Sequence, residues 1–235
     1  MQAAWISPRA ASHARPGGAP YTEPVQLKVY RSPRPFGALV LAHGAGAGQS
    51  SAFMVRMAEG LAQRGVSTAT FDFPYVAAGR KVPDRAPVLE RAWIDALAAA
   101  REQVPDQPLY IGGKSMGGRI ATHVASLGQA GPLAGIILLG YPLHPPGRPD
   151  RRRDAHLPAI REPMLFVQGS GDAFGSAEEI RALLPSLQEA TLHEIEGGDH
   201  SFKVPGGLGR QEPVLAGVMD TVVAWAKARL KLAAP

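Results

Sequence analysis

The chain has 235 residues, no cysteine and a formal net charge of +5 at pH 7. Its length and its apolar share of 45% fit one α/β domain with a buried sheet. The missing cysteines exclude disulfides, thiolate metal sites and a cysteine nucleophile. The basic balance could attract an anionic partner, but no interleaved aromatic residues or known binding motif accompany it, so we do not predict nucleic-acid binding.

Neither a membrane helix nor an exported protein is predicted. No apolar run approaches the roughly 20 residues that span a bilayer, and Pro8, Pro16 and Pro20 interrupt an N-terminus that has no apolar signal core. We therefore expect no membrane partner and a cytoplasmic location. Residues 1–24, rich in Ala, Pro and Gly, are expected to form a flexible lead-in to a single α/β domain at residues 25–235.

Short β-type runs alternate with longer amphipathic runs along the domain. We predict strands at 38–42, 66–71, 109–111, 135–139, 164–167 and 191–195. We predict helices at 51–64, 88–103, 115–127, 177–184 and 214–232. Strands without polar alternation are typical of a parallel sheet covered on both faces. Right-handed crossovers then give a doubly wound, three-layer α/β/α sandwich, with functional groups at the carboxyl ends of the strands.

A Gly-x-Ser-x-Gly motif lies at the end of the predicted strand at 109–111. The motif is weak evidence in a chain with 27 glycines, but here a strand precedes Ser115 and a helix follows it. This setting is typical of a nucleophile elbow, a strained turn that lifts the serine hydroxyl clear of the sheet, with Gly113 and Gly117 leaving room for strand and helix to cross. A phosphate-binding loop fits poorly, because the segment 107–109 lacks the earlier glycine.

His200 is the histidine best placed to act as a general base. It follows the predicted strand at 191–195, in a loop at the same sheet edge as Ser115. His144 and His156 could instead line the substrate entrance. The remaining candidates lie in the lead-in, the nucleophile helix and a strand, namely His13, His123 and His193.

The acid is expected between serine and histidine in chain order, on a loop after a strand. Asp172 meets both conditions, and its carboxylate could hold the imidazole of His200 in its useful tautomer. Asp172 could otherwise cap the helix that follows. Asp154 and Asp199 are the alternative acids.

Two backbone N–H groups are expected to stabilise an oxyanion. Met116 begins the helix after Ser115, so its N–H and the helix dipole point to the same place. The second donor is expected in the glycine-rich run that follows the strand at 38–42, with Ala45 favoured and Gly46 next. A flexible loop would explain the glycines, but not their position directly after His43 and Gly44.

Two basic features flank the predicted site. Lys114, beside the serine, is expected to point into solvent, with attraction of an anionic substrate as the alternative. The connection 142–153 is the place where a lid is often inserted, and its shortness predicts an open or lightly covered site. Its basic run, Arg148–Arg153, could hold an acidic acyl donor together with Arg119.

Four segments together resemble the α/β-hydrolase superfamily, namely 41–46, 113–119, 168–174 and 198–202. They look most like the small lidless branch related to dienelactone hydrolases, in particular the group with testis-expressed hydrolase-like proteins and a chromatin-complex scaffold subunit. The resemblance covers the chain from about Phe36 to the C-terminus. It implies a nucleophile at Ser115, an acid at Asp172 and a base at His200. Dienelactone hydrolases usually carry cysteine in place of Ser115, so their substrate is not implied.

These features predict a serine hydrolase that cleaves an ester-type bond of a small acyl substrate through an acyl-enzyme, with no metal or organic cofactor. The small domain and the absent lid favour short or exposed acyl groups over long lipid chains. The alternatives are a scaffold or binding protein on the same fold, or a hydrolase of peptide or carbon–carbon bonds.

Overall fold

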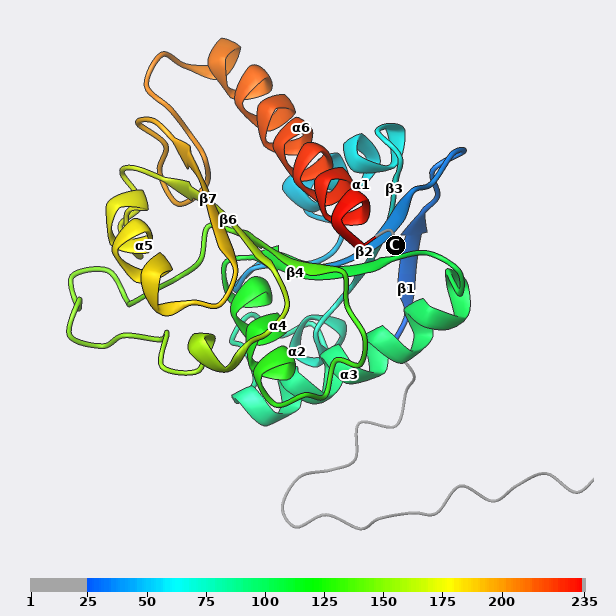
Figure 1. Cartoon of the computed structure of the whole chain (residues 1–235). Coiled ribbons are helices and arrows are strands. Elements are labelled where there is room, and N and C mark those ends of the chain that lie inside the picture. Colours follow the sequence, from blue (N-terminus) through cyan, green and yellow to red (C-terminus); the bar gives the residue numbers. More distant parts are fainter. Residues whose placement is uncertain (1–24, 234–235) are drawn as a thin grey trace, which may run out of the picture.

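A computed structural model describes residues 25–233. The predicted lead-in at residues 1–24 lies outside the described residues. Seven strands form one sheet in the order β1-β3-β2-β4-β5-β6-β7 (Figure 1). Their bounds are β1 Leu27–Tyr30, β2 Gly37–Ala42, β3 Val66–Phe71, β4 Leu109–Lys114, β5 Gly135–Leu139, β6 Met164–Gly169 and β7 Ala190–Ile195. Strand β1 pairs antiparallel with β3, and every other pairing is parallel.

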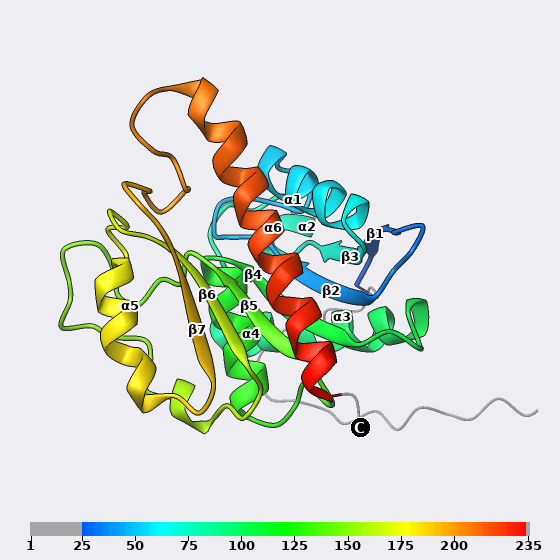
Figure 2. The same cartoon turned by 45° about the horizontal axis from the view of Figure 1, so that its top comes forward.

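Helices cover both faces of this sheet. Their bounds are α1 Ala52–Gln63, α2 Pro74–Ala77, α3 Ala86–Gln103, α4 Met116–Ser126, α5 Ala177–Leu183 and α6 Leu208–Ala233, with short 3₁₀ turns η1 Leu157–Ala159 and η2 Leu184–Ser186. Helices α1 and α6 lie side by side on one face (Figure 2), and α2 to α5 lie on the other. The predicted three-layer α/β/α sandwich is therefore confirmed.

Alternate residues of the buried strands divide the core between the two faces. On β2, Leu39 and Leu41 pack with α1 and α6, whereas Val40 and Ala42 pack with α3 and α4. All four are buried, as are all residues of β5. The apolar runs in the sequence thus reflect burial on two sides, which is why these strands were predictable.

The observed elements differ most from the prediction at β1, α2, β4 and α6. Strand β1 and the four-residue α2 were not predicted, because each is short and β1 is only partly buried at the sheet edge. Strand β4 continues through Gly112 and Gly113 to Lys114. Helix α6 begins at Leu208 and contains Pro213, where we expected a start at Val214. Proline has no N–H to donate to the carbonyl oxygen of Gly209, and because Gly209 is exposed, water can donate to that oxygen instead.

Within residues 25–233, no helix is both long enough and apolar enough to cross a bilayer. The connection from β5 to β6 contains only η1, so no lid domain covers this edge of the sheet.

Candidate active site

Ser115 occupies the turn between β4 and α4. Its φ of 50° and ψ of −117° lie outside the regions that L-residues favour, and such a conformation persists only where the surroundings enforce it. The Ser115 N–H donates to Leu139 O on β5 at 3.0 Å, which fixes the turn against the neighbouring strand. The predicted elbow is therefore present in the structure, at the end of a central strand.

Close packing around the elbow explains the two motif glycines. A Cβ on Gly113 would lie 2.6 Å from Ala42 O, and a Cβ on Gly117 would lie 2.5 Å from the same oxygen and 2.6 Å from His43 O. These are backbone atoms that cannot rotate away. The prediction that both glycines let the strand and helix cross closely is confirmed.

Ser115, His200 and Asp172 form one hydrogen-bonded row. Ser115 Oγ lies 2.8 Å from His200 Nε2, and His200 Nδ1 lies 2.7 Å from Asp172 Oδ2. A proton on Nδ1 donates to the carboxylate and leaves Nε2 free to accept the serine proton. The three residues come from the loops after β4, β6 and β7, which end at one edge of the sheet.

Asp172 does not cap helix α5, and the alternative acids Asp154 and Asp199 have other partners. Helix α5 is capped by Ser176, whose side chain accepts from Glu179 N–H in a capping box, so Asp172 is not its cap. Asp154 pairs with Arg152 at 2.5 Å. Asp199 accepts from backbone N–H groups of its own loop.

Gln168 holds the buried carboxylate in place, and the sequence patterns did not single it out. Asp172 is only 4% exposed, and its Oδ2 accepts from Gln168 Nε2 at 2.9 Å while its Oδ1 accepts from Phe174 N–H at 2.8 Å. Gln168 also accepts from Tyr141 N–H at 2.7 Å. A fully buried amide in the otherwise apolar strand β6 was the signal that could have revealed it.

Replacing Gln168 with methionine should lower the free energy of unfolding by about 1–3 kcal/mol, because Tyr141 N–H and Asp172 Oδ2 each lose a buried partner. Urea unfolding measures this change. The matched variant Gln129→Met, at an exposed position, should stay within about 0.5 kcal/mol of the wild type. Equal effects of the two substitutions would contradict the role of Gln168.

Phe174 packs against the histidine of the row. Its ring centroid lies 4.2 Å from that of His200, with the planes tilted by 31°. The contact restricts movement of the imidazole. Sequence reasoning named Phe174 only as part of a segment and gave it no role.

The glycine-rich loop after β2 lies beside the elbow. Ala45 and Met116 both line the pocket at Ser115, whereas Gly46, the second choice as donor, does not. Among the described residues, no backbone oxygen accepts from the N–H of Ala45, and Met116 is the first residue of α4, where the N–H has no intrahelical partner. Both groups are thus available to a ligand.

His43 anchors this loop. The ring is fully buried, with Nδ1 2.8 Å from Gly44 O and Nε2 3.2 Å from Phe73 N. Burial lowers the pKa of His43, and a neutral ring with its proton on Nδ1 accounts for both contacts. The histidine that precedes the loop is therefore a structural group, distinct from His200.

Lys114 does not point into solvent, so that expectation is wrong. Its ammonium donates to the backbone oxygen of His200 and lies 5.2 Å from the centre of the Phe202 ring. Burial lowers the pKa of Lys114 from its ordinary 10.5 to about 8, against the attraction of Asp172 and Asp199. This contact joins the end of β4 to a residue 86 positions later in the chain, so it depends on the tertiary fold.

Lys114 should make stability rise with pH in the alkaline range. Between its folded pKa of about 8 and its ordinary value of 10.5, the unfolded chain holds a proton that the folded chain has released. The free energy of unfolding therefore gains as pH rises through this window. The variant Lys114→Met lacks this gain, so its stability relative to the wild type should decline from pH 7.5 to pH 10 in urea titrations.

Exposed Lys81 supplies the control: Lys81→Met should follow the wild-type pH dependence. A stability difference between wild type and Lys114→Met that is the same at both pH values would contradict the proton linkage.

The histidines considered for the entrance lie away from it. His144 is buried and contacts Glu179 at 3.0 Å, and His156 contacts Thr122 at 2.8 Å. The pKa of His156 is lowered to about 4, mainly by burial and secondly by the charge of nearby His123. Neither His144 nor His156 lines the pocket, so the expectation that they could do so is wrong.

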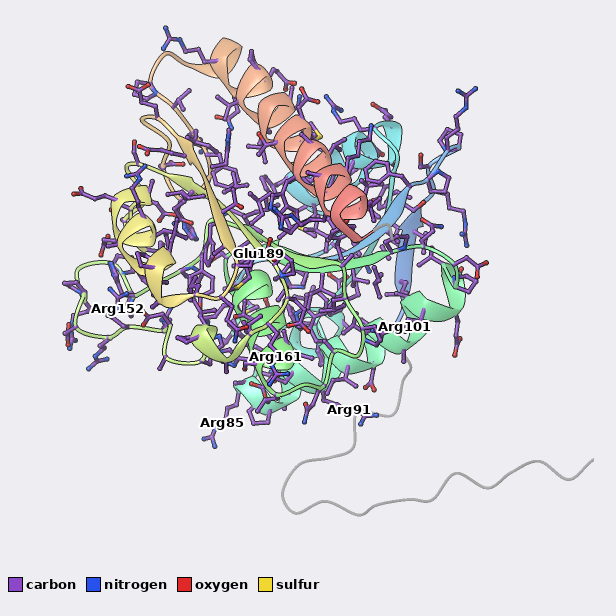
Figure 3. All side chains as sticks on the ribbon, viewed as in Figure 1. Arg85, Arg91, Arg101, Arg152, Arg161 and Glu189 are labelled. Atoms are coloured by element: carbon purple, nitrogen blue, oxygen red, sulfur yellow. The ribbon has the colours of Figure 1, made fainter. Side chains whose placement is uncertain are left out.

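A pocket of about 1310 Å³ opens over the row of Ser115 and His200. Its wall includes residues of α1, the elbow and the connection from β5 to β6. From the basic run only Arg153 lines it; Arg148 and Arg152 pair with Asp150 and Asp154, and Figure 3 places Arg152 on the outer loop. Within residues 25–233, no group of three His, Asp or Glu side chains is arranged to hold a metal ion.

The fold and the elbow define the class of protein. A model of the family described as "Alpha/beta hydrolase domain" matches residues 36–227. The chain belongs to this α/β-hydrolase family.

Solved structures share this fold. A dienelactone hydrolase from Anabaena variabilis is 20% identical, with a TM-score of 0.66 over 86% of this chain and 90% of that chain. A serine hydrolase without a lid from Xanthomonas campestris is 17% identical, with a TM-score of 0.65 over 86% and 89%. A thermostable carboxyl esterase from Bacillus coagulans is 14% identical, with a TM-score of 0.69 over 87% and 94%. At such identities the likeness concerns the fold alone.

Proposed function

We propose that the protein is a serine hydrolase that cleaves a carboxylester or thioester bond of a small acyl substrate. The observation that carries the proposal is the hydrogen-bonded row from Ser115 Oγ through His200 to buried Asp172. Esterase and serine-hydrolase names among proteins of the same fold support it. The pocket above Ser115 supplies room for the substrate.

The reaction proceeds in two steps. His200 Nε2 takes the proton of Ser115 Oγ as that oxygen attacks the carbonyl carbon, and Asp172 stabilises the resulting imidazolium. The N–H groups of Ala45 and Met116 donate to the oxyanion. The leaving group departs with the proton from His200, and a water activated by His200 then releases the acid and restores Ser115.

Labelling with a fluorophosphonate probe tests the proposal, because the probe phosphonylates an activated serine, whose oxygen displaces fluoride. We expect the wild-type protein to be labelled and Ser115→Ala to remain unlabelled. Ser126→Ala, at the far end of α4, is the matched control and should label as the wild type. An unlabelled wild type would favour a scaffold on this fold, and labelling that survives in Ser115→Ala would place the nucleophile elsewhere.

The finer resemblance belongs to the same proposal. The four segments around Ala45, Ser115, Asp172 and His200 support a place beside the testis-expressed hydrolase-like proteins and the scaffold subunit of a chromatin complex. Domain bounds of 25–235 and a cytoplasmic location stay predictions from the sequence.

A further inference from the structure

Three arginines line the pocket beside the candidate nucleophile; Arg56 pairs with Glu212, whereas Arg119 and Arg153 do not pair with an acidic residue in the described part of the chain. Arg119 lies in the first turns of α4, and its N–H donates to Ser115 O at 3.0 Å. Arg153 belongs to the connection from β5 to β6. Both line the pocket that also contains Ser115 and His200.

The backbone of Arg153 is fixed, although it lies in a loop. Its N–H donates to Leu143 O at 2.8 Å, and its carbonyl oxygen accepts from the hydroxyl of Tyr141 at 2.6 Å. Tyr141 is itself buried. The side chain of Arg153 is therefore presented to the pocket from a defined position.

Neither arginine has an acidic partner within residues 25–233. Arg119 Nη1 lies 3.3 Å from His123 Nε2, and His123 in turn contacts Glu90 at 2.9 Å. Arg119 Nε is buried and donates to no described protein atom. The neighbouring Arg148 and Arg152, by contrast, each pair with an aspartate.

The two guanidinium groups also act on each other. Burial lowers the pKa of Arg119, and the charge of Arg153 lowers it further. Like charges held together and partly removed from water are stabilised by an anion placed between them, and the planar guanidinium suits the two oxygens of a carboxylate. Two acidic residues line the pocket, and neither pairs with Arg119 or Arg153. Asp84 pairs with Arg80 at 2.8 Å, and Glu59 lies on α1.

We propose that Arg119 and Arg153 form a carboxylate-binding subsite, so that the substrate is an ester that carries a second, ionised carboxylate near the scissile bond. This inference rests on the proposed function, since it assigns a substrate class to the same site. Water would be consumed at the ester carbonyl, the carbon–oxygen bond to the alcohol would break with the proton going to the alcohol oxygen, and the remote carboxylate would stay unchanged on the arginines.

Matched pairs of esters test the subsite. Monomethyl glutarate carries the carboxylate on the acyl side and 4-acetoxybutanoate carries it on the alcohol side, while methyl glutaramate and 4-acetoxybutanamide replace it by a neutral amide of similar shape. Hydrolysis at pH 7 is followed by pH-stat titration for the wild type, Arg119→Gln, Arg153→Gln and Arg151→Gln. Arg151 is an exposed neighbour that does not line the pocket, so its loss changes the charge equally.

We expect kcat/KM of the wild type to favour the acid over the amide by at least about tenfold in one of the two pairs, because charge-assisted hydrogen bonds to the arginines are lost with the amide. The ratio should fall at least about fivefold in Arg153→Gln and in Arg119→Gln, and should keep its wild-type value in Arg151→Gln. Arg153→Gln decides the result if Arg119→Gln, at a partly buried helix position, unfolds. Ratios near one in both pairs, from a protein whose Ser115 is labelled by the fluorophosphonate, would overturn the subsite and leave the hydrolase intact.

Binding without turnover separates the two proposals. Calorimetric titration of Ser115→Ala with monomethyl glutarate and with 4-acetoxybutanoate should show, for one of the two esters, binding that weakens at least about fivefold when Arg153→Gln is added. If the wild type is not labelled but this dependence on Arg153 holds, the subsite stands and the hydrolase proposal falls. Binding of both esters that is the same with and without Arg153 would overturn the subsite.

Discussion

His200→Ala should lower kcat for p-nitrophenyl acetate by roughly 10³- to 10⁶-fold, with a smaller change in KM. The imidazole lies 2.8 Å from Ser115 Oγ and 2.7 Å from Asp172 Oδ2. Without it, no group in the row can take the serine proton or return it to the leaving group. The N–H groups of the loop and the elbow would still stabilise an oxyanion, so a residual rate above that of water is expected.

The control for this prediction is His193→Ala. His193 lies on β7, and its Nε2 lies 3.4 Å from the hydroxyl oxygen of Thr221. It is the same residue type on the strand that leads to the His200 loop, so loss of activity through a general disturbance of β7 would appear in both variants. A kcat for His200→Ala within about tenfold of the wild type would remove His200 from the chemistry.

Gly117→Ala should destabilise the fold by at least about 3 kcal/mol and remove labelling of Ser115 by the fluorophosphonate. A Cβ at this position would lie 2.5 Å from Ala42 O and 2.6 Å from His43 O. Both oxygens belong to the backbone of β2 and its following loop, so either α4 moves away from the sheet or the loop that carries Ala45 moves. Either movement changes the distance between the Ala45 N–H and the elbow residues Ser115 and Met116. Urea unfolding and labelling of the folded fraction measure the two effects.

Gly217→Ala is the matched control. Gly217 lies in α6 at an exposed position where an added Cβ meets nothing within 4 Å. The substitution should raise the free energy of unfolding by up to about 1 kcal/mol, because alanine favours the helix more than glycine does. Gly117→Ala with wild-type stability and labelling would show that the elbow tolerates a wider crossing of strand and helix.

The positions of the site residues on loops after separate strands could be predicted from the sequence, because they depend on local patterns. Ser115 lies between a strand and a helix, and Asp172 and His200 each follow an apolar strand. In a parallel sheet the carboxyl ends of such strands meet at one edge, so short motifs far apart in sequence become neighbours without further information. The same apolar runs fixed the burial of β2, β4, β5 and β6.

Contacts across the sheet edge could not be read in this way. Lys114 was expected in solvent, yet its ammonium meets the carbonyl of His200, a residue 86 positions later in the chain. Gln168 reaches Tyr141, which follows β5, only because β6 lies beside β5. Arg119 and Arg153 meet in one pocket because the connection from β5 to β6 folds back over α4.

The sequence by itself determined the sandwich of helices and parallel strands, the strained turn at Ser115 and the order of serine, acid and histidine, because periodicity and glycine spacing act over a few residues. The tertiary structure alone decided the partners of each side chain: the hydrogen bonds at 2.7 and 2.8 Å along the row, the burial of Lys114 and the arginines that share the pocket. Those depend on how loops from separate strands approach one another in space, which no local pattern specifies.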